Sequence, residues 1–117
     1  SSKNLSNSAD IEILEFHHNK KRDVPSGTAI SLFDSINKGK NQAKKTVFRT
    51  QTSDKIRHKD EVGFSSIRGG DVVGEHTVFF FMDGERIELT HKASDRKIFS
   101  IGALKAAKWI YKLKIWY

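Results

Sequence analysis

The pattern of apolar and polar residues predicts a succession of short strands interrupted by two helices. Strands are predicted where β-branched and aromatic residues gather over strand length, and helices where apolar residues recur at intervals of three and four. The predicted elements, in chain order, are a strand at 10–17, a helix at 27–37, a short strand near 46–50, strands at 62–68, 76–82 and 85–92, and a helix at 100–112. Clustered strands with flanking helices indicate an α+β domain with a mixed β-sheet and helices on one face.

The most apolar part of this pattern is a hairpin in the second half of the chain. Five large apolar residues, Val78–Met82, precede Asp83-Gly84, a dipeptide typical of hairpin turns, and a second strand follows. Alternate side chains of the run must point to opposite faces of the sheet. The predicted helices can cover one face, but no further predicted element covers the other, and large exposed apolar patches are rare in soluble monomers. The sequence therefore predicts that the sheet packs against another chain.

A helix start with anion-binding character lies between the first strand and the first helix. Pro25 excludes helix at Val24, and Ser26 is a favoured N-cap residue for the amphipathic helix that follows. The backbone N–H groups of Gly27 and Thr28 then fall in the first turn, where orphan donors and the helix dipole favour a carboxylate. Helix starts of this kind are common in purely structural roles, so this one becomes a candidate site only together with its neighbours.

Those neighbours are side chains that can donate protons near neutral pH. His17 and His18 follow the apolar part of the first strand, and Lys21 lies three residues further on, where its flexible stem can return to the same pocket. Adjacent strand residues point to opposite faces, so the two histidines are expected to have different roles. The residues themselves do not decide which histidine is the proton donor.

The composition of the chain argues against several classes of protein and of binding site. A length of 117 residues fits one domain with a single modest core, and the absence of cysteine fits a cytoplasmic protein without disulfides or thiolate metal sites. No apolar stretch reaches the length of a membrane span, and no signal peptide is recognisable, so no membrane partner is expected. The five histidines lack metal-ligand spacing, so no metal site is expected either.

The formal net charge is +7, and the positive excess is concentrated in residues 38–59. A basic segment of this kind is compatible with nucleic-acid binding. A solvated, variable loop is the interpretation we favour, because the continuous phenylalanines of the hairpin indicate burial rather than an exposed platform for stacking bases. We therefore expect no nucleic-acid partner.

Three ordered blocks of the sequence resemble one enzyme family. They are EFHHNKKRDVPSGTA at 15–29, GFSSIRGGDVVGEHTV at 63–78 and GERIELTHKAS at 84–94. These blocks are similar to the substrate-binding and oligomerisation domain of 4-hydroxy-tetrahydrodipicolinate reductase (dihydrodipicolinate reductase). Phe16 stands where members of that family usually have a smaller residue.

The resemblance implies roles for the residues singled out above. His17 and Lys21 correspond to the proton-donor pair of the family, and His18, Gly27 and Thr28 to residues that bind substrate. The implied reaction is reduction of 4-hydroxy-tetrahydrodipicolinate, a small-molecule dicarboxylate, to tetrahydrodipicolinate with NADPH or NADH, in diaminopimelate and lysine biosynthesis. The implied assembly is a homotetramer whose core is formed by the sheets.

The resemblance also implies a division into domains. Residues 1–117 are expected to be a single C-terminal domain, with the N-terminal dinucleotide-binding domain of these reductases absent. The chain contains no Gly-x-Gly-x-x-Gly motif, and the glycines of 69–74 have the wrong spacing and no following helix. We therefore expect no cofactor-binding residues here and no activity from these residues alone. The alternatives are an isolated oligomerisation domain without activity and a basic nucleic-acid-binding module.

Overall fold

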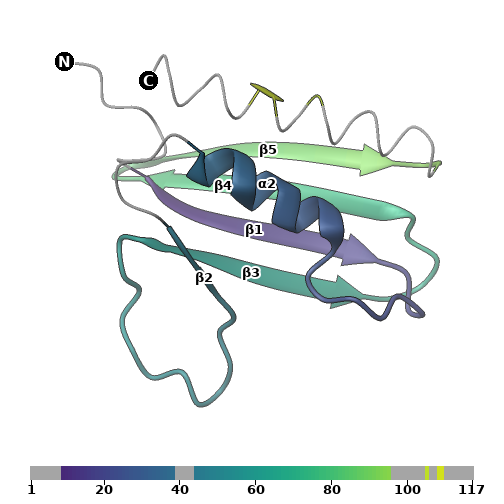
Figure 1. The fold of residues 1–117 in the computed structure, drawn as a ribbon, viewed down its shortest axis with the longest axis horizontal. Helices are drawn as coiled ribbons and strands as arrows, with labels where there is room; N and C mark the ends of the chain where they lie inside the picture. The colour runs from purple at the N-terminus through teal and green to yellow at the C-terminus, as the bar shows by residue number, and fades with distance from the viewer. Residues whose placement is uncertain (1–8, 39–43, 96–104, 106–107, 110–117) are drawn as a thin grey trace.

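The computed structural model of the chain describes residues 9–38, 44–95, 105 and 108–109. Within these ranges a five-stranded sheet carries a helix across one of its faces (Figure 1). The elements are β1 (Asp10–His17), α2 (Gly27–Asn37), β2 (Lys45–Val47), β3 (Glu61–Arg68), β4 (Gly74–Met82) and β5 (Glu85–Ala93). The α+β class and the helix-covered sheet that the sequence predicts are confirmed.

The sheet is mixed, in the strand order β2-β3-β1-β4-β5. The central strand β1 pairs in parallel with β3 and antiparallel with β4. β2 extends the parallel side, and β5 forms the predicted antiparallel hairpin with β4. Because β1 and β3 run in parallel, both end at the same edge of the sheet, and the chain returns between them through α2 (Figure 1).

The predicted boundaries agree closely with the observed ones. The strand at 10–17 and the helix at 27–37 have the predicted bounds, and the three later strands begin or end one or two residues beyond them. The short strand near 46–50 is instead Lys45–Val47, because its parallel ladder with β3 ends at the pair Val47–Gly63. Of the predicted helix at 100–112, residues 105, 108 and 109 are helical and the others lie outside the described residues.

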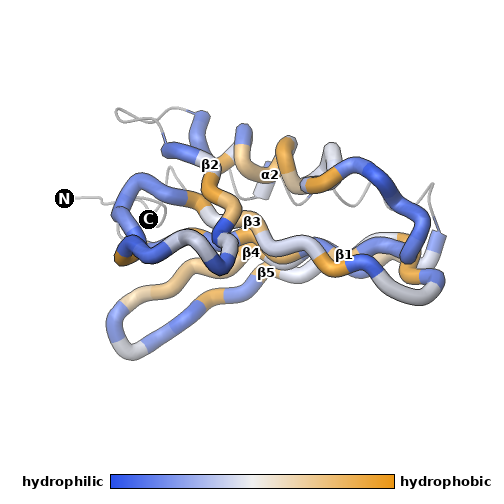
Figure 2. Tube along the Cα trace, turned by 90° about the horizontal axis from the view of Figure 1, so that it is seen from below, coloured by the Kyte–Doolittle hydropathy of each residue, from blue (hydrophilic) through white to orange (hydrophobic). Residues whose placement is uncertain are grey.

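The hydrophobic core lies between α2 and the face of the sheet that it covers. Every second residue of β1 from Ile11 onward is buried, which is the periodicity of a strand with one covered face. α2 contributes side chains at helical spacing to the same layer, and Figure 2 shows the helix on one side of the strands. The core residues are Ala9, Ile11, Ile13, Ala29, Leu32, Ile36, Val62, Phe64, Val78 and Phe80.

The opposite face of the sheet, here called the outer face, carries a second set of apolar side chains. Strand register assigns to it Leu14, Phe16, Ile67, Phe79 and Phe81. The rings of Phe79 and Phe81 are stacked, with centroids 5.5 Å apart, and both residues are half-buried, whereas Phe80 is 1% exposed in the core. The predicted alternation of the phenylalanine run is therefore confirmed. No helix among the described residues lies on the outer face (Figure 2).

The basic segment is bound to the sheet by arginines. Arg57 Nη2 donates to Ile11 O at 2.7 Å, and together with Arg49 it pairs with the Glu12 carboxylate. The N–H of Gly63 donates to the same carboxylate at 2.9 Å, and a Cβ on Gly63 would collide with Glu12 and Arg49. The loop is exposed over most of its length, and these two arginines attach it to the sheet. No helix in the described part of the chain is long and apolar enough to span a membrane.

Candidate functional site

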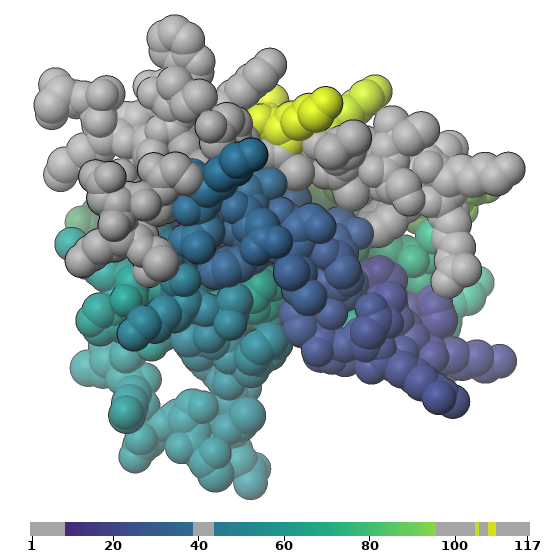
Figure 3. Space-filling model, viewed as in Figure 1, coloured from purple at the N-terminus to yellow at the C-terminus, as the bar shows by residue number. Residues whose placement is uncertain are grey.

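The residues that the sequence singles out meet at the edge of the sheet where β1 and β3 end. His17 is the last residue of β1 and pairs with Arg68, the last residue of β3. The loop from His18 to Ser26 leads from this edge to the start of α2, and it forms one end of the molecular face in Figure 3. The strand ends and the helix start therefore place His17 and Gly27 in one region.

A buried carboxylate forms the centre of this region. Glu15 is fully buried, and its two oxygens accept hydrogen bonds from five donor atoms. These are His17 Nδ1 at 2.6 Å, the Ser26 N–H at 3.1 Å, Ser66 Oγ at 2.8 Å, and Arg68 Nη1 and Nη2 at 2.7 and 2.9 Å. The carboxylate thus joins the end of β1 to β3 and to the residue that caps α2.

These donors keep Glu15 ionised. Burial by itself would raise the pKa of the carboxyl group, but the hydrogen bonds from Arg68, His17, Ser66 and the Ser26 backbone outweigh it and lower the pKa to about 2. An ionised carboxylate can only accept hydrogen bonds. The proton in the bond between Glu15 and His17 therefore lies on Nδ1 of the imidazole.

His17 is buried, with 5% of its surface exposed, on the face of the sheet that α2 covers. Burial is the largest influence on its pKa and lowers it, and the charges of Lys21 and Arg68 act in the same direction. The carboxylate of Glu15 opposes this lowering. His17 is consequently a mostly neutral imidazole at pH 7 whose Nδ1–H is held in place, so a proton gained or lost must be exchanged at Nε2.

His18 has a different environment, as the alternation along the strand predicts. It lies just beyond β1, is half-buried, and its Nδ1 accepts the backbone N–H of Lys20 at 3.2 Å. In neutral His18 the proton therefore lies on Nε2, the opposite tautomer from His17. Of the two histidines, only His17 is bonded to a buried carboxylate.

Lys21 lies near both buried histidines. Its Nζ pairs with Asp23 Oδ1 at 2.9 Å, and its backbone N–H donates to His18 O, which closes the turn after β1. The positive charge of Lys21 contributes to lowering the pKa of His17 and of His76. The ammonium group is held by Asp23 on the loop that follows β1, and its return to the pocket stays a prediction.

The start of α2 has the expected capping geometry. Ser26 Oγ accepts the N–H of Ala29 at 3.1 Å, which confirms Ser26 as the N-cap residue. The N–H groups of Gly27 and Thr28 precede the first intrahelical hydrogen bond and have no acceptor within the helix. A Cβ placed on Gly27 meets no atom within 4 Å, so this side of the turn is open to a ligand.

His76 belongs to the same cluster, although the sequence analysis did not single it out. It is 2% exposed on β4, its Nε2 lies 2.7 Å from Ser26 Oγ, and its ring packs edge-on against His17 with centroids 5.2 Å apart. Burial lowers the pKa of His76 to about 4, with a smaller contribution from the His17 charge. His76 is therefore neutral at pH 7 and connects the sheet to the helix cap.

The fold brings together three potential metal ligands that sequence spacing does not reveal. Glu15, His17 and His76 each offer a ligand atom, and these atoms lie within 4.8 Å of one another. The Arg68 guanidinium, however, lies 2.7 Å from the same Glu15 oxygen that accepts the His17 hydrogen bond. A cation placed there would have to displace that guanidinium, so we assign no metal to this cluster.

Besides His76, three members of the site lay outside the residues proposed from sequence: Glu15, Ser66 and Arg68. Glu15 carried a usable signal, because alternation along β1 places it on the same face as Ile11 and Ile13, where a charge needs a partner. Its partners on β3 depend on a parallel register between segments more than 50 residues apart, which no local pattern reveals.

The glycine-containing segment 69–74 does not fit a dinucleotide. It joins β3 to β4, so a strand follows it rather than the helix whose N-terminus would hold a pyrophosphate. Gly70 has a positive φ of 57°, and its carbonyl accepts the N–H of Asn19. These glycines shape the turn beside His17, and we derive no step through a nucleotide bound to them.

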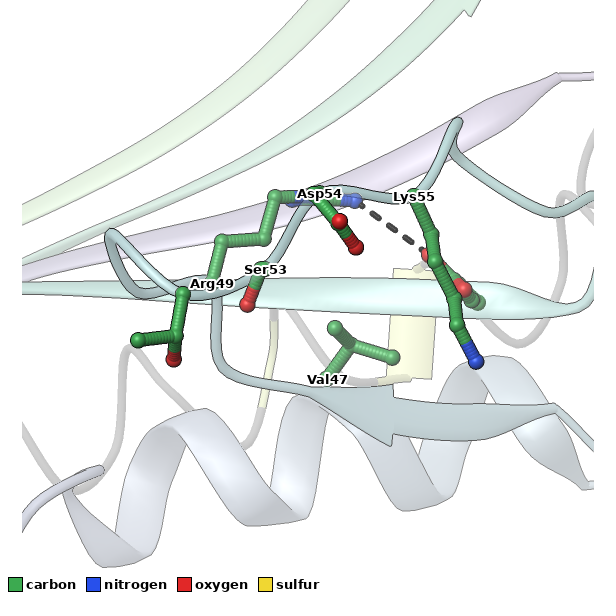
Figure 4. A pocket seen from close by; sticks show the side chains of 7 residues that line it. Val47, Arg49, Ser53, Asp54 and Lys55 are labelled. Atoms are coloured by element: carbon green, nitrogen blue, oxygen red, sulfur yellow. Dashed lines mark ion pairs between the residues drawn. The ribbon is translucent and has the colours of Figure 1, made fainter.

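A hollow of about 270 Å³ lies beside the basic loop (Figure 4). It is lined by Val47, Arg49, Thr52, Ser53, Asp54, Lys55 and Glu61. The most strongly basic group, Arg49, is already paired with Glu12 and lies 3.6 Å from the Glu61 carboxylate, the pair drawn as a dashed line. The hollow therefore offers little uncompensated positive charge for an anion, and the end of β1 is the stronger candidate.

Comparison with known proteins points to one family. The family described as "Dihydrodipicolinate reductase, C-terminus" matches residues 1–117. Curated relatives named 4-hydroxy-tetrahydrodipicolinate reductase include one from Archaeoglobus fulgidus, 53% identical over 105 residues that cover 89% of this chain and 41% of the relative. Another, from Helicobacter pylori strain P12, is 48% identical over 102 residues, covering 87% of this chain and 40% of the relative. The chain thus spans about two fifths of the length of the curated relatives it matches.

A solved structure supports the fold. The chain is similar to a structure described as dipicolinate-bound dihydrodipicolinate reductase from Paenisporosarcina sp. TG-14, with a TM-score of 0.59 and 22% sequence identity. The similarity covers 93% of this chain and 42% of that one. At this identity the comparison establishes a shared architecture, and residue roles must be argued from the site itself.

Proposed function

The chain belongs to the family of the dihydrodipicolinate reductase C-terminal domain, and from this premise we propose that it is the substrate-binding part of a 4-hydroxy-tetrahydrodipicolinate reductase. The complete protein would reduce 4-hydroxy-tetrahydrodipicolinate to tetrahydrodipicolinate in diaminopimelate and lysine biosynthesis. The observation that carries this proposal is the convergence of a carboxylate-held imidazole, His17, with an ammonium group, Lys21, and an open helix start at Gly27.

The chemistry of the reaction fits these groups. Conversion of the 4-hydroxy substrate to tetrahydrodipicolinate removes the hydroxyl group as water and adds a hydride and a proton. The two carboxylates of the substrate also bring negative charge that the site must stabilise. In our proposal the N–H groups of Gly27 and Thr28 bind one carboxylate at the positive end of α2. His18 and Lys21 lie on the loop beside that turn and bind substrate or its second carboxylate.

His17 and Lys21 are the proposed proton donors. Because His17 Nδ1–H is bonded to Glu15, the imidazolium form would release its proton from Nε2. The lowered pKa of His17 makes that proton more acidic, although it reduces the protonated fraction at neutral pH. Lys21 is a second source of the proton and adds a positive charge where charge develops on the substrate.

The hydride must come from a pyridine nucleotide, NADPH or NADH, which the described residues of this chain do not fit. We propose that residues 1–117 are one domain, the C-terminal one, and that a separate dinucleotide-binding domain of the same protein holds the nucleotide. The family match to a C-terminal domain and the two-fifths coverage of the relatives support this division. A homotetramer built on the outer face of the sheet, in the cytoplasm, completes the proposal and is supported by the half-buried phenylalanines of that face.

The proposal is tested by assaying the full-length protein and residues 1–117 side by side. We expect the full-length protein to oxidise NADPH or NADH in the presence of 4-hydroxy-tetrahydrodipicolinate, followed by loss of nicotinamide absorbance. We expect residues 1–117 alone to show no turnover, because the hydride donor has no binding site there. Turnover by the 117 residues would refute the division into domains, and an inactive full-length protein would refute the assignment of function.

A further inference from the structure

We propose that Glu15 is a positioning residue for the proton donor, fixing the tautomer and orientation of His17 relative to the carboxylate-binding start of α2. The proposal rests on the proposed function in taking His17 as a proton donor. It goes further by assigning a role to a buried group that does not itself reach the substrate.

The first support is the pattern of bonds on the Glu15 carboxylate. One oxygen accepts from His17 Nδ1 at 2.6 Å, and the other accepts from the Ser26 N–H at 3.1 Å. His17 is the imidazole, and Ser26 is the residue that caps α2 directly before Gly27. One rigid group thus contacts both halves of the site and sets the distance between them.

The second support is the way in which the carboxylate is itself held. Arg68 donates to both oxygens, at 2.7 and 2.9 Å, and Ser66 Oγ donates to one of them at 2.8 Å. Both residues lie on β3, beside the strand that carries Glu15 and His17. Glu15 has 0% exposure, so neither rotation nor solvent competes with this arrangement. The imidazole is consequently oriented by two strands and a helix cap together.

A carboxylate at this position has a specific consequence for proton transfer. Because ionised Glu15 accepts and does not donate, Nδ1 of His17 remains protonated whether the ring is neutral or charged. The proton that moves is then always the one on Nε2. Other groups that act on the ring include the charges of Lys21 and Arg68, which disfavour the imidazolium, and His76, whose ring packs edge-on against it. Glu15 favours the imidazolium form.

A purely structural role for the Glu15–Arg68 pair is the competing interpretation, and Glu12 supplies the matched control. Glu12 lies three residues earlier on β1 and is also bonded to arginines, Arg49 and Arg57, and to a backbone N–H, that of Gly63. Register places it with Phe79 on the outer face, away from His17. Glu15→Gln and Glu12→Gln therefore remove the same charge from the same strand. Only Glu15→Gln removes a carboxylate that contacts the His17 imidazole.

The experiment measures the tautomer of His17 by ¹⁵N NMR in the full-length protein, and kcat against pH in the parent and both variants. In the parent we expect neutral His17 to carry its proton on Nδ1. In Glu15→Gln we expect a mixture of tautomers and a kcat lower by roughly 10–100-fold. The limb of the kcat profile that reports loss of the acid should move to lower pH by about one unit, because the amide no longer favours the imidazolium. Glu12→Gln should keep the parent's kcat and pH profile.

Two results would overturn the proposal. One is the finding that neutral His17 in the parent carries its proton on Nε2. This measurement requires no variant, so it decides the matter even if Glu15→Gln does not fold. The other is a Glu15→Gln protein with the same tautomer and pH profile as Glu12→Gln. A full-length protein that lacks reductase activity would refute the proposed function instead, while the tautomer measurement would still decide the role of Glu15.

Discussion

His17 and His18 are adjacent in the chain, yet their hydrogen bonds require opposite neutral tautomers. Nδ1 of His17 donates to Glu15, whereas Nδ1 of His18 accepts from the Lys20 backbone. The difference arises because β1 ends at His17, so that one ring faces the core side of the sheet and the other lies in the loop. We propose that His17 and Lys21 donate the proton and that His18 binds substrate.

This assignment predicts how single substitutions affect catalysis in the full-length protein. Lys21→Ala and His17→Ala should each lower kcat by roughly 10²–10⁴-fold, the usual contribution of a general acid. Lys20→Ala is the matched control, since Lys20 is an exposed neighbour on the same loop and should keep the parent's kcat. Steady-state kinetics gives kcat for each variant, and the melting temperature verifies that each variant is folded.

We expect the His17→Ala and Lys21→Ala proteins to differ in their free energy of unfolding. Lys21 pairs with Asp23 in a partly exposed ion pair, so its removal should change the melting temperature little. His17 is buried and bonded to Glu15, so His17→Ala should also destabilise the protein by about 1–3 kcal/mol. Near-normal kcat together with a lowered melting temperature in both variants would mean that these residues are structural only.

At the scale of elements, the contact between β4 and the cap of α2 couples stability to pH. His76 has a pKa of about 4 in the folded protein, because it is buried, against about 6.5 in an unfolded chain. Between these values the unfolded chain binds more protons, so stability should be complete above about pH 6.5 and should fall as the pH drops toward 4. The effect is on the order of 3 kcal/mol, and the lowered pKa of His17 acts in the same direction.

Urea unfolding of the full-length protein at pH 7.5 and pH 5 measures this coupling. His76→Gln should reduce the difference in unfolding free energy between the two pH values, because glutamine does not titrate but can still bond to Ser26. An unchanged pH dependence in His76→Gln would show that His76 does not titrate in the way that we infer. The separate contribution of Glu15, with its pKa of about 2, is lost only below about pH 4.5.

The bounds of most elements could be predicted from the sequence, but their order in the sheet could not. The bounds of β1 and α2 followed from local spacing and from the Ser26 cap, which depend on neighbouring residues alone. The strand order β2-β3-β1-β4-β5 did not follow, because strand pairing is set by contacts between distant segments. Local spacing singled out His17, Lys21 and Gly27 as candidates, whereas the partners of Glu15 on β3 depend on the pairing of distant segments.

At the scale of the whole molecule, the outer face of the sheet predicts assembly. Phe79 lies half-buried on that face and stacks on Phe81, whereas Phe80 is fully in the core. Phe79→Asp should therefore release a smaller but folded species from the full-length assembly, and Phe80→Asp should unfold the protein. Phe48→Asp, at a half-exposed phenylalanine outside the sheet ladder, should leave the assembly intact. Sedimentation equilibrium combined with circular dichroism separates these outcomes.

A parent protein that sediments as a monomer at micromolar concentration would contradict assembly through the outer face. If Phe79→Asp unfolded as Phe80→Asp does, the two faces would not be separable, and the outer face could not be treated as an interface independent of the fold.

The central claim is that a dicarboxylate binds at the start of α2, beside the proton donor at the end of β1. The most direct test is a crystal structure of the full-length protein with dipicolinate, the ligand of the solved relative. We predict one carboxylate on the N–H groups of Gly27 and Thr28, with His17 Nε2 and Lys21 Nζ facing the ligand. Dipicolinate bound instead in the hollow beside Arg49, or without contact to the first turn of α2, would contradict the account.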